Sequence, residues 1–415
     1  MKNIILILLS TMSIFASNLS ELIQNAQQNE LVEVYKSKLD SSTKVYDATR
    51  SAYLPKIEFG ASGQFVSPPD SMGAAQIYNT YAQASVVLLD GFKRENILDE
   101  KNKLKDASKY DLAQIKKDIS LQVSTIYFNL QIVYSDIASL EQSKKQLIEQ
   151  LNQQQKFFEA RLTTEDNVAR IEAAIANMDY QIEVKKYQYD EYKTLLETLT
   201  NINIDKPTKQ IIIEPVDVET NELDSIKSIQ AQADSIGYKA QQLDSANYPT
   251  IVLSDKYSYT TFKDDSLEDL SALGFDIERV NSQNTLMLSL SMNLFDFGAT
   301  SKQKEAALSE QNALLSQLAY KKKETNADVK LALRAIQRAK KLLYASKLSQ
   351  DASNRTYEIV HKKYKARVVD YVKYLDALSN KTESDAQYNR AQGALQISYA
   401  KYYHSAGLDI KEYIK

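Results

Sequence analysis

The sequence predicts a mainly helical protein of mixed α and β structure, in which long antiparallel coiled-coil helices are joined to two β-hairpins and the whole unit occurs twice. Three observations lead to this prediction. The 415 residues include only nine glycines and six prolines, so long helices can run without interruption. Apolar residues recur at steps of three and four over most of the chain, as in coiled-coil helices. In two regions the period changes to two, which indicates β-strands.

Residues 1–16 have the pattern of a secretory signal peptide. Lys2 supplies a positive charge, Ile4 to Leu9 is a short apolar run, and Ser13 to Ala16 offers a cleavage site. The apolar run is shorter than the roughly 18–20 residues that a membrane-spanning helix needs, and no later run approaches that length. The sequence therefore predicts an exported protein that could enter a membrane only through β-strands.

The first repeat is expected to cover residues 17–200. It begins with a helix that runs from about Asn18 to Ala52, because Pro55 pushes the residue before it out of the α region. The next elements, in order, are a β-hairpin at about 56–90, a long helix over 92–159 and a return helix over 164–200. The apolar residues that alternate along the hairpin are Ile57, Phe59, Ala61, Gly63 and Phe65, then Ala82, Ala84, Val86 and Leu88.

The second repeat is expected to cover residues 221–415, after a linker or equatorial segment at 201–220 that contains one short strand, Ile211 to Ile213. Its elements, in order, are a helix, a β-hairpin at about 250–296, a long helix over 299–365, a return helix over 369–405 and a short C-terminal tail. Asp90 and Asp296 are 206 positions apart, and the same offset holds along the long helix and past the turn. A constant spacing is expected where two arms share one rod, whereas loops absorb changes in length.

The alternation in the hairpins has two interpretations. An apolar face opposite a polar face over about ten residues is typical of a transmembrane β-barrel strand. An ordinary half-buried antiparallel sheet gives the same pattern. Export and the paired hairpins favour the barrel. The smallest barrels have about eight strands, so the four strands of one chain would have to share a barrel with other chains.

The composition argues against several classes of site. There is no cysteine, which excludes disulfides and thiolate zinc sites, and the net charge of −3 gives no support for nucleic-acid binding. The two histidines, His361 and His404, are far apart in sequence, and lysines surround His361. No phosphate-binding glycine loop or zinc-protease motif occurs. The sequence predicts no enzyme, no metal site and no cofactor.

Over essentially the whole mature chain, the arrangement resembles the TolC family of outer-membrane efflux and secretion ducts. The residues that carry the resemblance are Ala52-Tyr53-Leu54-Pro55, Leu89-Asp90-Gly91, Ala246-Asn247-Tyr248-Pro249, Leu294-Phe295-Asp296-Phe297-Gly298 and the stretch Tyr364 to Ala377. The resemblance implies a homotrimer, with a 12-stranded β-barrel in outer-membrane lipid and a helical tube that extends into the periplasm of a Gram-negative bacterium.

The resemblance also implies a periplasmic gate near the second helix turn. Its candidate residues here are Tyr364, Asp370, Lys373, Asp376, Asp166 and Asn167. Asp376 matches an acidic position that forms a ring around the threefold axis, where like charges would repel one another and favour cations. Lys373 stands where family members often have a second acid. Tyr364 matches a tyrosine that bonds the polar pair corresponding to Asp166 and Asn167.

The two turns are the implied docking tips for a periplasmic adaptor, with Arg161 and Leu162 in the first and Arg367 and Val368 in the second. Family members usually have glycine where Arg161 and Arg367 stand. Glycine supplies the positive φ that ends many helices, and arginine adopts it at a cost. The sequence therefore predicts turns with a different backbone.

The predicted function is a passive exit duct of a tripartite efflux or type I secretion system, driven by an inner-membrane pump of the RND or ABC type through the adaptor (membrane fusion) protein. Multidrug efflux, metal export and protein secretion all remain open as the cargo. An exported structural or adhesive coiled-coil protein without channel activity is the alternative, and an enzyme is the third class considered. Conductance, outer-membrane fractionation and a detergent-stable trimer separate the first two.

Overall fold

The computed structural model describes residues 18–67, 74–216, 221–265, 274 and 280–415, so the predicted signal peptide lies outside the described residues. Its helices and four strands confirm the predicted fold class. Contacts divide the chain into two compact units. The first is made of Met1–Lys36, Asp111–Ser225 and Lys321–Lys415, and the second of Ser37–Tyr110 and Ile226–Tyr320. Each unit therefore takes segments from both halves of the sequence.

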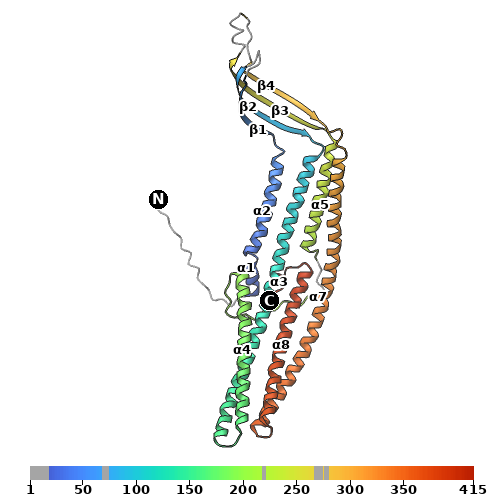
Figure 1. The fold of residues 1–415 in the computed structure, drawn as a ribbon. Helices are drawn as coiled ribbons and strands as arrows, with labels where there is room; N and C mark the ends of the chain where they lie inside the picture. The colour runs from blue at the N-terminus through green and yellow to red at the C-terminus, as the bar shows by residue number, and fades with distance from the viewer. Residues whose placement is uncertain (1–17, 68–73, 217–220, 266–273, 275–279) are drawn as a thin grey trace. The chain divides into compact units, whose positions relative to one another are not determined.

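The second unit contains a four-stranded antiparallel sheet in the order β1-β2-β3-β4 (Figure 1). The strands are β1 (Lys56–Phe65), β2 (Ala74–Leu89), β3 (Thr250–Asp265) and β4 (Ser282–Ser291). β1 and β4 are the two edges, and among the described residues each pairs with one other strand. Within the described part of the chain, the sheet is therefore open at both edges.

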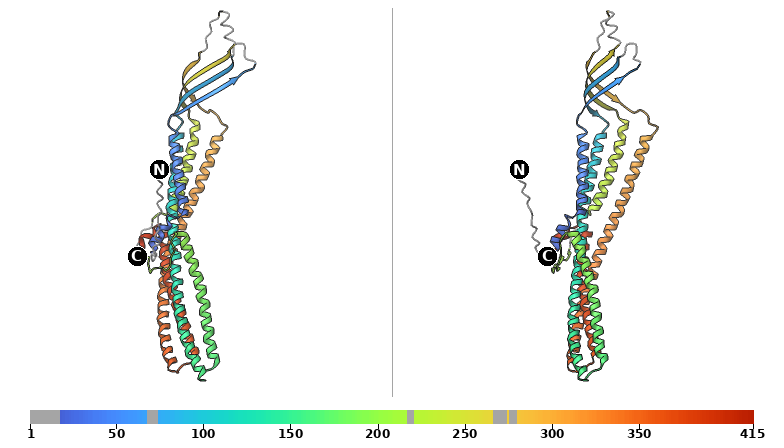
Figure 2. Two further views of the ribbon diagram at one scale, coloured as in Figure 1. Left: turned by 90° about the vertical axis from the view of Figure 1, so that its left-hand side faces the viewer. Right: turned by 60° about the vertical axis from the view of Figure 1, so that its left-hand side comes forward.

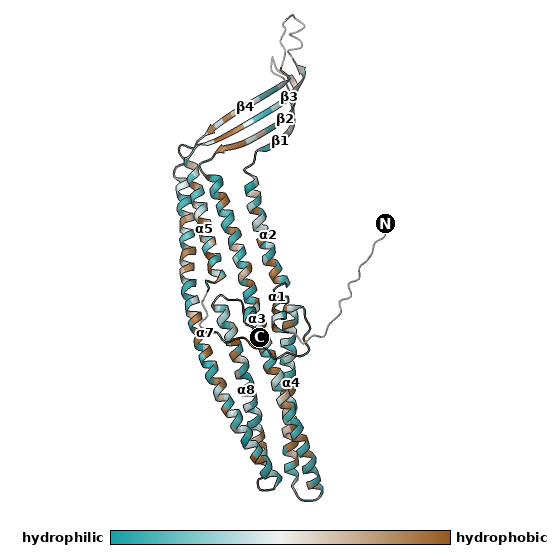
Figure 3. Ribbon diagram, turned by 180° about the vertical axis from the view of Figure 1, so that it is seen from behind, coloured by the Kyte–Doolittle hydropathy of each residue, from teal (hydrophilic) through white to brown (hydrophobic). Residues whose placement is uncertain are grey.

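The register places the alternating apolar residues of all four strands on one face of the sheet. Ile57 pairs with Ala84, and Ile251 pairs with Leu290. Val86 pairs with Leu253, which joins the two hairpins at the centre of the sheet. Because side chains alternate between faces along a strand, these pairs determine which face of the sheet the other alternating residues occupy. In Figure 3, brown apolar residues occur along the strands among teal and white ones.

β4 differs from the expected strand. The sequence predicted a hairpin that extends to about residue 296, but the ladder with β3 ends at the pair Thr250 and Ser291. Pro249, the residue before Thr250, has no backbone N–H to donate, so the pairing cannot extend past it. Met292 and Leu294 remain exposed.

The long helices have equal lengths. α3 (Lys93–Glu159) and α7 (Ala299–Lys365) each contain 67 residues, as the constant offset between the halves predicts. Further described helices are α4 (Glu165–Thr200), α5 (Asp224–Asp244), α8 (Tyr371–Ser405) and the short 3-10 turns η1 (Ser245–Asn247) and η2 (Ile410–Tyr413). In the first unit, α3, α4, α7 and α8 run alongside one another (Figures 1 and 2).

The prediction of a single N-terminal helix is wrong. The structure has two helices, α1 (Leu19–Ala26) and α2 (Glu30–Ser51), with a break at residues 27–29. The side chain of Asn29 accepts a hydrogen bond from the backbone N–H of Val32 at 3.1 Å, which caps α2. It also donates to the carbonyl oxygen of Leu199 in α4. Asn29 therefore caps the start of α2 and fixes it against α4.

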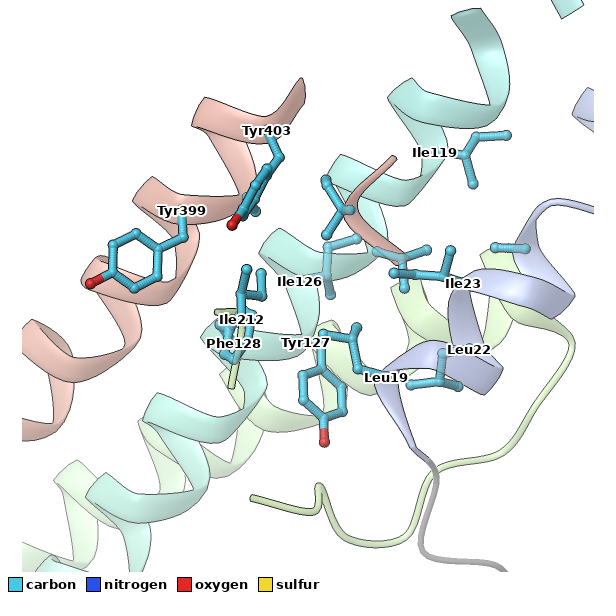
Figure 4. Close-up of a cluster of buried hydrophobic side chains, with 14 of the residues drawn as sticks. Leu19, Leu22, Ile23, Ile119, Ile126, Tyr127, Phe128, Ile212, Tyr399 and Tyr403 are labelled. Carbon is cyan, nitrogen blue, oxygen red and sulfur yellow. The ribbon is translucent and has the colours of Figure 1, made fainter. Parts of the chain in front are cut away.

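The main core of the first unit lies where α1, α3, α8 and the linker meet. Leu19, Leu22 and Ile23 of α1 pack against α3, as Figure 4 shows. The short strand expected in the linker pairs with the C-terminal tail, since Ile212 forms an antiparallel bridge with Ile414. The hydroxyl of Tyr403 in α8 donates to the carbonyl oxygen of Ile213 at 3.0 Å. These contacts tie the linker between the repeats to the end of the chain.

Candidate functional site at the helix turns

The two helix turns have the same backbone, and it is the one that glycine usually supplies. Arg161 has a φ of 59° and Arg367 a φ of 56°, both in the left-handed region. The prediction of a different backbone at these turns is therefore wrong. For a residue with a Cβ, the left-handed conformation costs roughly 1–2 kcal/mol. The backbone is therefore strained at both Arg161 and Arg367.

Paired hydrogen bonds explain how each turn holds this conformation. At the first turn, the N–H of Arg161 donates to the Phe158 carbonyl at 2.9 Å and that of Leu162 to the Phe157 carbonyl at 2.7 Å. At the second, the N–H of Arg367 donates to the Tyr364 carbonyl and that of Val368 to the Lys363 carbonyl, each at 2.9 Å. This is the Schellman pattern, which satisfies carbonyls left free at a helix end.

A cation–π contact joins the two turns. The guanidinium carbon of Arg367 lies 4.9 Å from the centre of the Phe157 ring. Phe157 belongs to the last turn of α3, and Arg367 follows the end of α7. Contacts of this kind contribute about 0.5–1 kcal/mol at exposed sites. Arg367 thus has a partner on the other hairpin, which a glycine could not have.

An aromatic cluster lies directly behind the second turn. Tyr374 of α8 is completely buried, and the rings of Tyr357, His361, Tyr364 and Tyr371 surround it at centroid distances of 5.0–6.0 Å. Burial raises the pKa of Tyr371 and of Tyr374 well above the ordinary tyrosine range. The hydroxyls of Tyr371 and Tyr374 therefore stay protonated at physiological pH, and the cluster packs the start of α8 against the end of α7.

Three polar contacts connect α3 to the hairpin formed by α7 and α8. The Tyr357 hydroxyl donates to Gln146 Oε1 at 3.0 Å, and Gln154 Nε2 donates to the Tyr364 hydroxyl at 2.5 Å. Farther from the turns, the hydroxyls of Ser143 and Thr382 are 2.8 Å apart. Such side-chain bonds are modest in net energy, about 0.5–1.5 kcal/mol each, but leaving one partner unpaired costs more.

The partner of Tyr364 differs from the one expected. Its hydroxyl bonds Gln154 of α3, whereas Asn167 donates to the hydroxyls of Thr163 and Thr164 within its own turn. Asp166 lies 3.7 Å from Arg170 in an exposed i,i+4 pair. Among the described side chains, no hydrogen bond joins Tyr364 to Asp166 or Asn167.

The acidic and basic candidates on α8 fall into two groups. Asp370 is the N-cap of α8, and its carboxylate accepts a hydrogen bond from the backbone N–H of Lys373 at 3.0 Å. Lys373 and Asp376 are both exposed on the same side of the helix, one turn apart. Within the part of the chain that the structure describes, they form no ion pair with each other. Their side chains are therefore available to another molecule.

The sequence did not single out Gln146, Gln154 or Phe157 as members of this site. Gln146, Gln150 and Gln154 follow one another at four-residue steps on α3, so they share a face of the helix. This four-residue spacing of glutamines, together with the tyrosine-rich segment on α7 and α8, could have predicted a polar contact between the helices. Among the described residues of this region, the buried atoms Gln150 Oε1, His361 Nδ1 and the Tyr371 hydroxyl oxygen have no hydrogen-bond partner.

His361 packs against the aromatic cluster. Its ring lies 5.6 Å from the centroids of Tyr357 and of Tyr374. Burial, and then the nearby charge of Lys365, lower the pKa of His361 below its ordinary value. In the described ranges, no group of three or more histidine, cysteine or carboxylate side chains could hold a metal ion. No described helix is long and apolar enough to span a membrane.

Comparison with solved structures places the fold among outer-membrane channels. The CmeC outer membrane channel of Campylobacter jejuni has a TM-score of 0.81 at 17% identity, over 94% of this chain and 86% of that one. The open-state MtrE outer membrane channel of Neisseria gonorrhoeae has a TM-score of 0.80 at 19% identity, over 94% and 89%. VceC, an outer membrane protein of Vibrio cholerae, has a TM-score of 0.78 at 15% identity, over 94% and 96%.

Comparison of sequences identifies the family. No curated protein gives a significant match to the chain. The model of the outer membrane efflux protein family matches residues 22–201 and 221–408, which are the two halves of the internal repeat and leave out only the linker and the ends. The chain therefore belongs to the outer membrane efflux protein family, and it is an exit channel of the outer membrane.

Proposed function

We propose that three copies of the chain form one duct, in which the three sheets close a 12-stranded barrel in the outer membrane and the helices form a tube in the periplasm. The observation that carries this proposal is the open sheet, which has a mainly apolar face across all four strands and two edges without a partner among the described residues. An exposed sheet edge cannot persist in lipid, because its backbone groups would have no hydrogen-bond partners. Joining β4 of one copy to β1 of the next satisfies both edges.

The chain supplies a path and no source of energy. An inner-membrane pump of the RND or ABC type would drive transport, and a periplasmic adaptor would connect that pump to the duct. The proposed adaptor-docking tips are the two turns, where Leu162 and Val368 are exposed beside Arg161 and Arg367. The tips carry two cations per chain and are rigidly capped. They suit an adaptor surface with carboxylates or backbone carbonyls.

The proposed gate is the start of α8. In a trimer, the exposed side chains of Lys373 and Asp376 would form two adjacent rings of opposite charge if this side of α8 faces the pore. Rings of like charge restrict passage and select ions, while neighbouring rings of opposite sign partly neutralise each other. Tyr357 and Tyr364 belong to α7, and their contacts with α3 would hold the hairpin of α7 and α8, and with it the start of α8, in the closed position.

Fractionation and mass measurement test the proposal. The full chain, expressed with its own N-terminus in a Gram-negative host, should appear in the outer-membrane fraction. After extraction in detergent, light scattering should give the mass of three chains. A monomer in the soluble periplasmic fraction would contradict the proposal and would favour an exported coiled-coil protein without channel activity.

The pump and the cargo class can be identified in the same preparation. Mild cross-linking in cells followed by purification should recover one inner-membrane transporter and its adaptor. Recovery of an RND transporter would indicate efflux of small molecules, and recovery of an ABC transporter would indicate type I secretion or ATP-driven efflux. Arg161→Glu with Arg367→Glu should reduce recovery of the adaptor while the trimer remains intact.

A further inference from the structure

The face of the sheet opposite the mainly apolar one is polar and carries an unbalanced positive charge. Within residues 56–65, 74–89, 250–263 and 282–291, the charged side chains of this polar face are Lys56, Glu58 and Lys256. The ammonium of Lys56 lies 2.5 Å from the carboxylate of Glu58, so these two charges balance each other. Among the described side chains, Lys256 makes no ion pair. The apolar face carries one charge of each sign, on Asp255 and Lys263.

An aromatic ring holds the Lys256 side chain on the polar face. Lys256 Nζ lies 4.3 Å from the centre of the Tyr81 ring, and both side chains are half-buried. Tyr81 of β2 pairs with Gly60 of β1. A Cβ added at Gly60 would come within 2.5 Å of the ring, so the ring lies across β1 where glycine leaves room for it. Because a cation is attracted to the face of an aromatic ring, the ammonium of Lys256 has a defined place on this face.

The same three residue types occur together on the apolar face. Gly63 of β1 pairs with Tyr78 of β2, and a Cβ added at Gly63 would lie 3.4 Å from the Tyr78 ring. Lys263 Nζ of β3 lies 5.9 Å from the centre of that ring. Register places this second set opposite the first, because Tyr78 and Tyr81 are three residues apart on one strand. The chain therefore contains a matched pair of lysines, one on each face of the sheet.

A neighbouring copy would not balance the charge of Lys256. In the proposed barrel, β4 of one copy lies beside β1 of the next. Neither β2 nor β4 contains a charged residue. The strand that the next copy adds therefore brings no charge to the Lys56–Glu58 pair or to Lys256. Each chain contributes one unbalanced positive charge at this level of the sheet, and a threefold axis would repeat it in every copy.

We propose that Lys256 of the three copies forms a ring of ammonium groups in the lumen of the barrel and that this ring favours the passage of anions. The polar face lines the lumen, since the apolar face of a transmembrane barrel contacts lipid. Rings of cationic side chains favour anions in pores. The chemical class of cargo that suits the duct is therefore a solute with net negative charge. This inference rests on the proposed trimeric duct and adds the charge of its cargo.

The width of a 12-stranded barrel lets such a ring act on the whole lumen at low salt. Strands about 4.8 Å apart and tilted by about 40° give a circumference of about 75 Å and a radius of roughly 12 Å. The Debye length is about 30 Å at 0.01 M salt, about 10 Å at 0.1 M and about 3 Å at 1 M. The field of the ring therefore reaches the axis in dilute salt and is screened in concentrated salt. The preference for anions should weaken in the same order.

Reversal potentials of single channels test the ring. They are measured in a planar bilayer across a gradient of potassium chloride from about 0.01 M to about 0.1 M. The ratio of chloride to potassium permeability should be highest for the natural protein, lower for Lys256→Gln and lowest for Lys256→Glu, in which the ring becomes negative. Comparing variants isolates the contribution of the ring, because the rest of the duct is unchanged. The differences should shrink when both solutions are near 1 M.

The matched control uses the lysine on the other face. Lys263→Gln and Lys263→Glu should leave the permeability ratio unchanged, because the side chain of Lys263 lies outside the lumen. Light scattering should give the mass of three chains for every variant. Equal ratios for the natural protein, Lys256→Gln and Lys256→Glu, or equal changes in the Lys263 variants, would overturn the ring and leave the duct standing. A trimer that inserts and passes no current would overturn the duct itself.

Chemical modification gives a second test in which the charge is changed after the protein has folded. The natural chain has no cysteine, so Lys256→Cys introduces one thiol per chain. Its thiolate attacks a methanethiosulfonate reagent, forms a mixed disulfide and releases methanesulfinate. A reagent with a trimethylammonium group restores the positive charge and should raise the ratio of chloride to potassium permeability. A reagent with a sulfonate group should lower that ratio, and reductant should reverse both changes.

The same reagents on Lys263→Cys provide the control for this second test. Modification on the outer face of the barrel should leave the permeability ratio of the open channel unchanged. Failure of both reagents to change the ratio in Lys256→Cys channels would place this residue away from the lumen and overturn the ring. Changes of the same sign with both reagents would also overturn it, because they would reflect the size of the added group and not its charge.

Discussion

The guanidinium of Arg367 stacks on the ring of Phe157, with 4.9 Å between its central carbon and the ring centre. This contact links the second helix turn to the first. Together with the hydrogen bonds from Tyr357 to Gln146 and from Gln154 to Tyr364, it holds the α7–α8 hairpin against α3 at the end of the helices. Movement of one hairpin relative to the other would have to break these contacts.

Glycine at the first turn should increase stability. Arg161 has a left-handed backbone, so Arg161→Gly should relieve strain and raise the free energy of unfolding by about 1 kcal/mol. Arg367→Gly relieves the same strain but removes the contact with Phe157, so its gain should be smaller. Thermal denaturation of the two variants compares them. Arg161→Val, with a β-branched side chain at the same φ, should be destabilising. A gain in stability for Arg161→Val would contradict the claim that the backbone at position 161 is strained.

The bond between Gln154 and Tyr364 should behave as a coupled pair. Gln154→Leu leaves the half-buried Tyr364 hydroxyl without its partner and should cost about 1–3 kcal/mol of stability. Tyr364→Phe should cost less on its own, and the double variant should cost less than the sum of the two single changes. Denaturant unfolding of all four proteins gives the coupling energy. Strict additivity would show that the bond does not contribute to the folded state.

Alanine substitutions of Asp376 and Asp370 should have different effects, the first on the channel gate and the second on the stability of α8. Asp376→Ala removes an exposed carboxylate and should change divalent-cation block or closure of the channel with little change in stability. Asp370→Ala removes the N-cap of α8 and should cost about 1 kcal/mol of stability. Single-channel recording and thermal denaturation of both variants give the comparison. Unchanged channel behaviour in Asp376→Ala would remove this residue from the pore.

The aromatic cluster should weaken at acidic pH. The folded state holds the pKa of His361 below its unfolded value of about 6.5, so it favours the neutral ring. This stabilisation is complete above the unfolded pKa and is lost as the pH falls through the folded pKa. Between pH 7 and pH 5, the natural protein should therefore lose more stability than His361→Phe. Parallel loss in the two proteins would show that other groups cause the pH dependence.

The repeat and the strand faces could be predicted from the sequence because both depend on spacing. The offset between Asp90 and Asp296 gave two long helices of equal length, and the two-residue alternation gave the apolar face of the sheet. Local patterns of this kind survive in the fold, because each is enforced along its whole length by packing or by strand register.

Features that depend on a partner elsewhere in the chain could not be predicted. The left-handed Arg367 is held by its own helix end and by Phe157, which is 210 positions away. Tyr364 bonds Gln154, and β4 ends where the neighbouring strand reaches Pro249. The break before α2 depends on Asn29 and its contact with Leu199. Each outcome is decided by a tertiary contact that local propensity does not record.

The most direct test of the account is conductance of the purified, unmodified protein in a planar lipid bilayer. The account predicts stepwise increases in current as single trimers insert, without nucleotide or any other energy source, because the duct is a passive path. The account would be contradicted by a folded trimer from the outer-membrane fraction that inserts into the bilayer and passes no current. The current would have to stay absent also when Asp376 and Lys373 are both replaced by alanine to open the proposed gate.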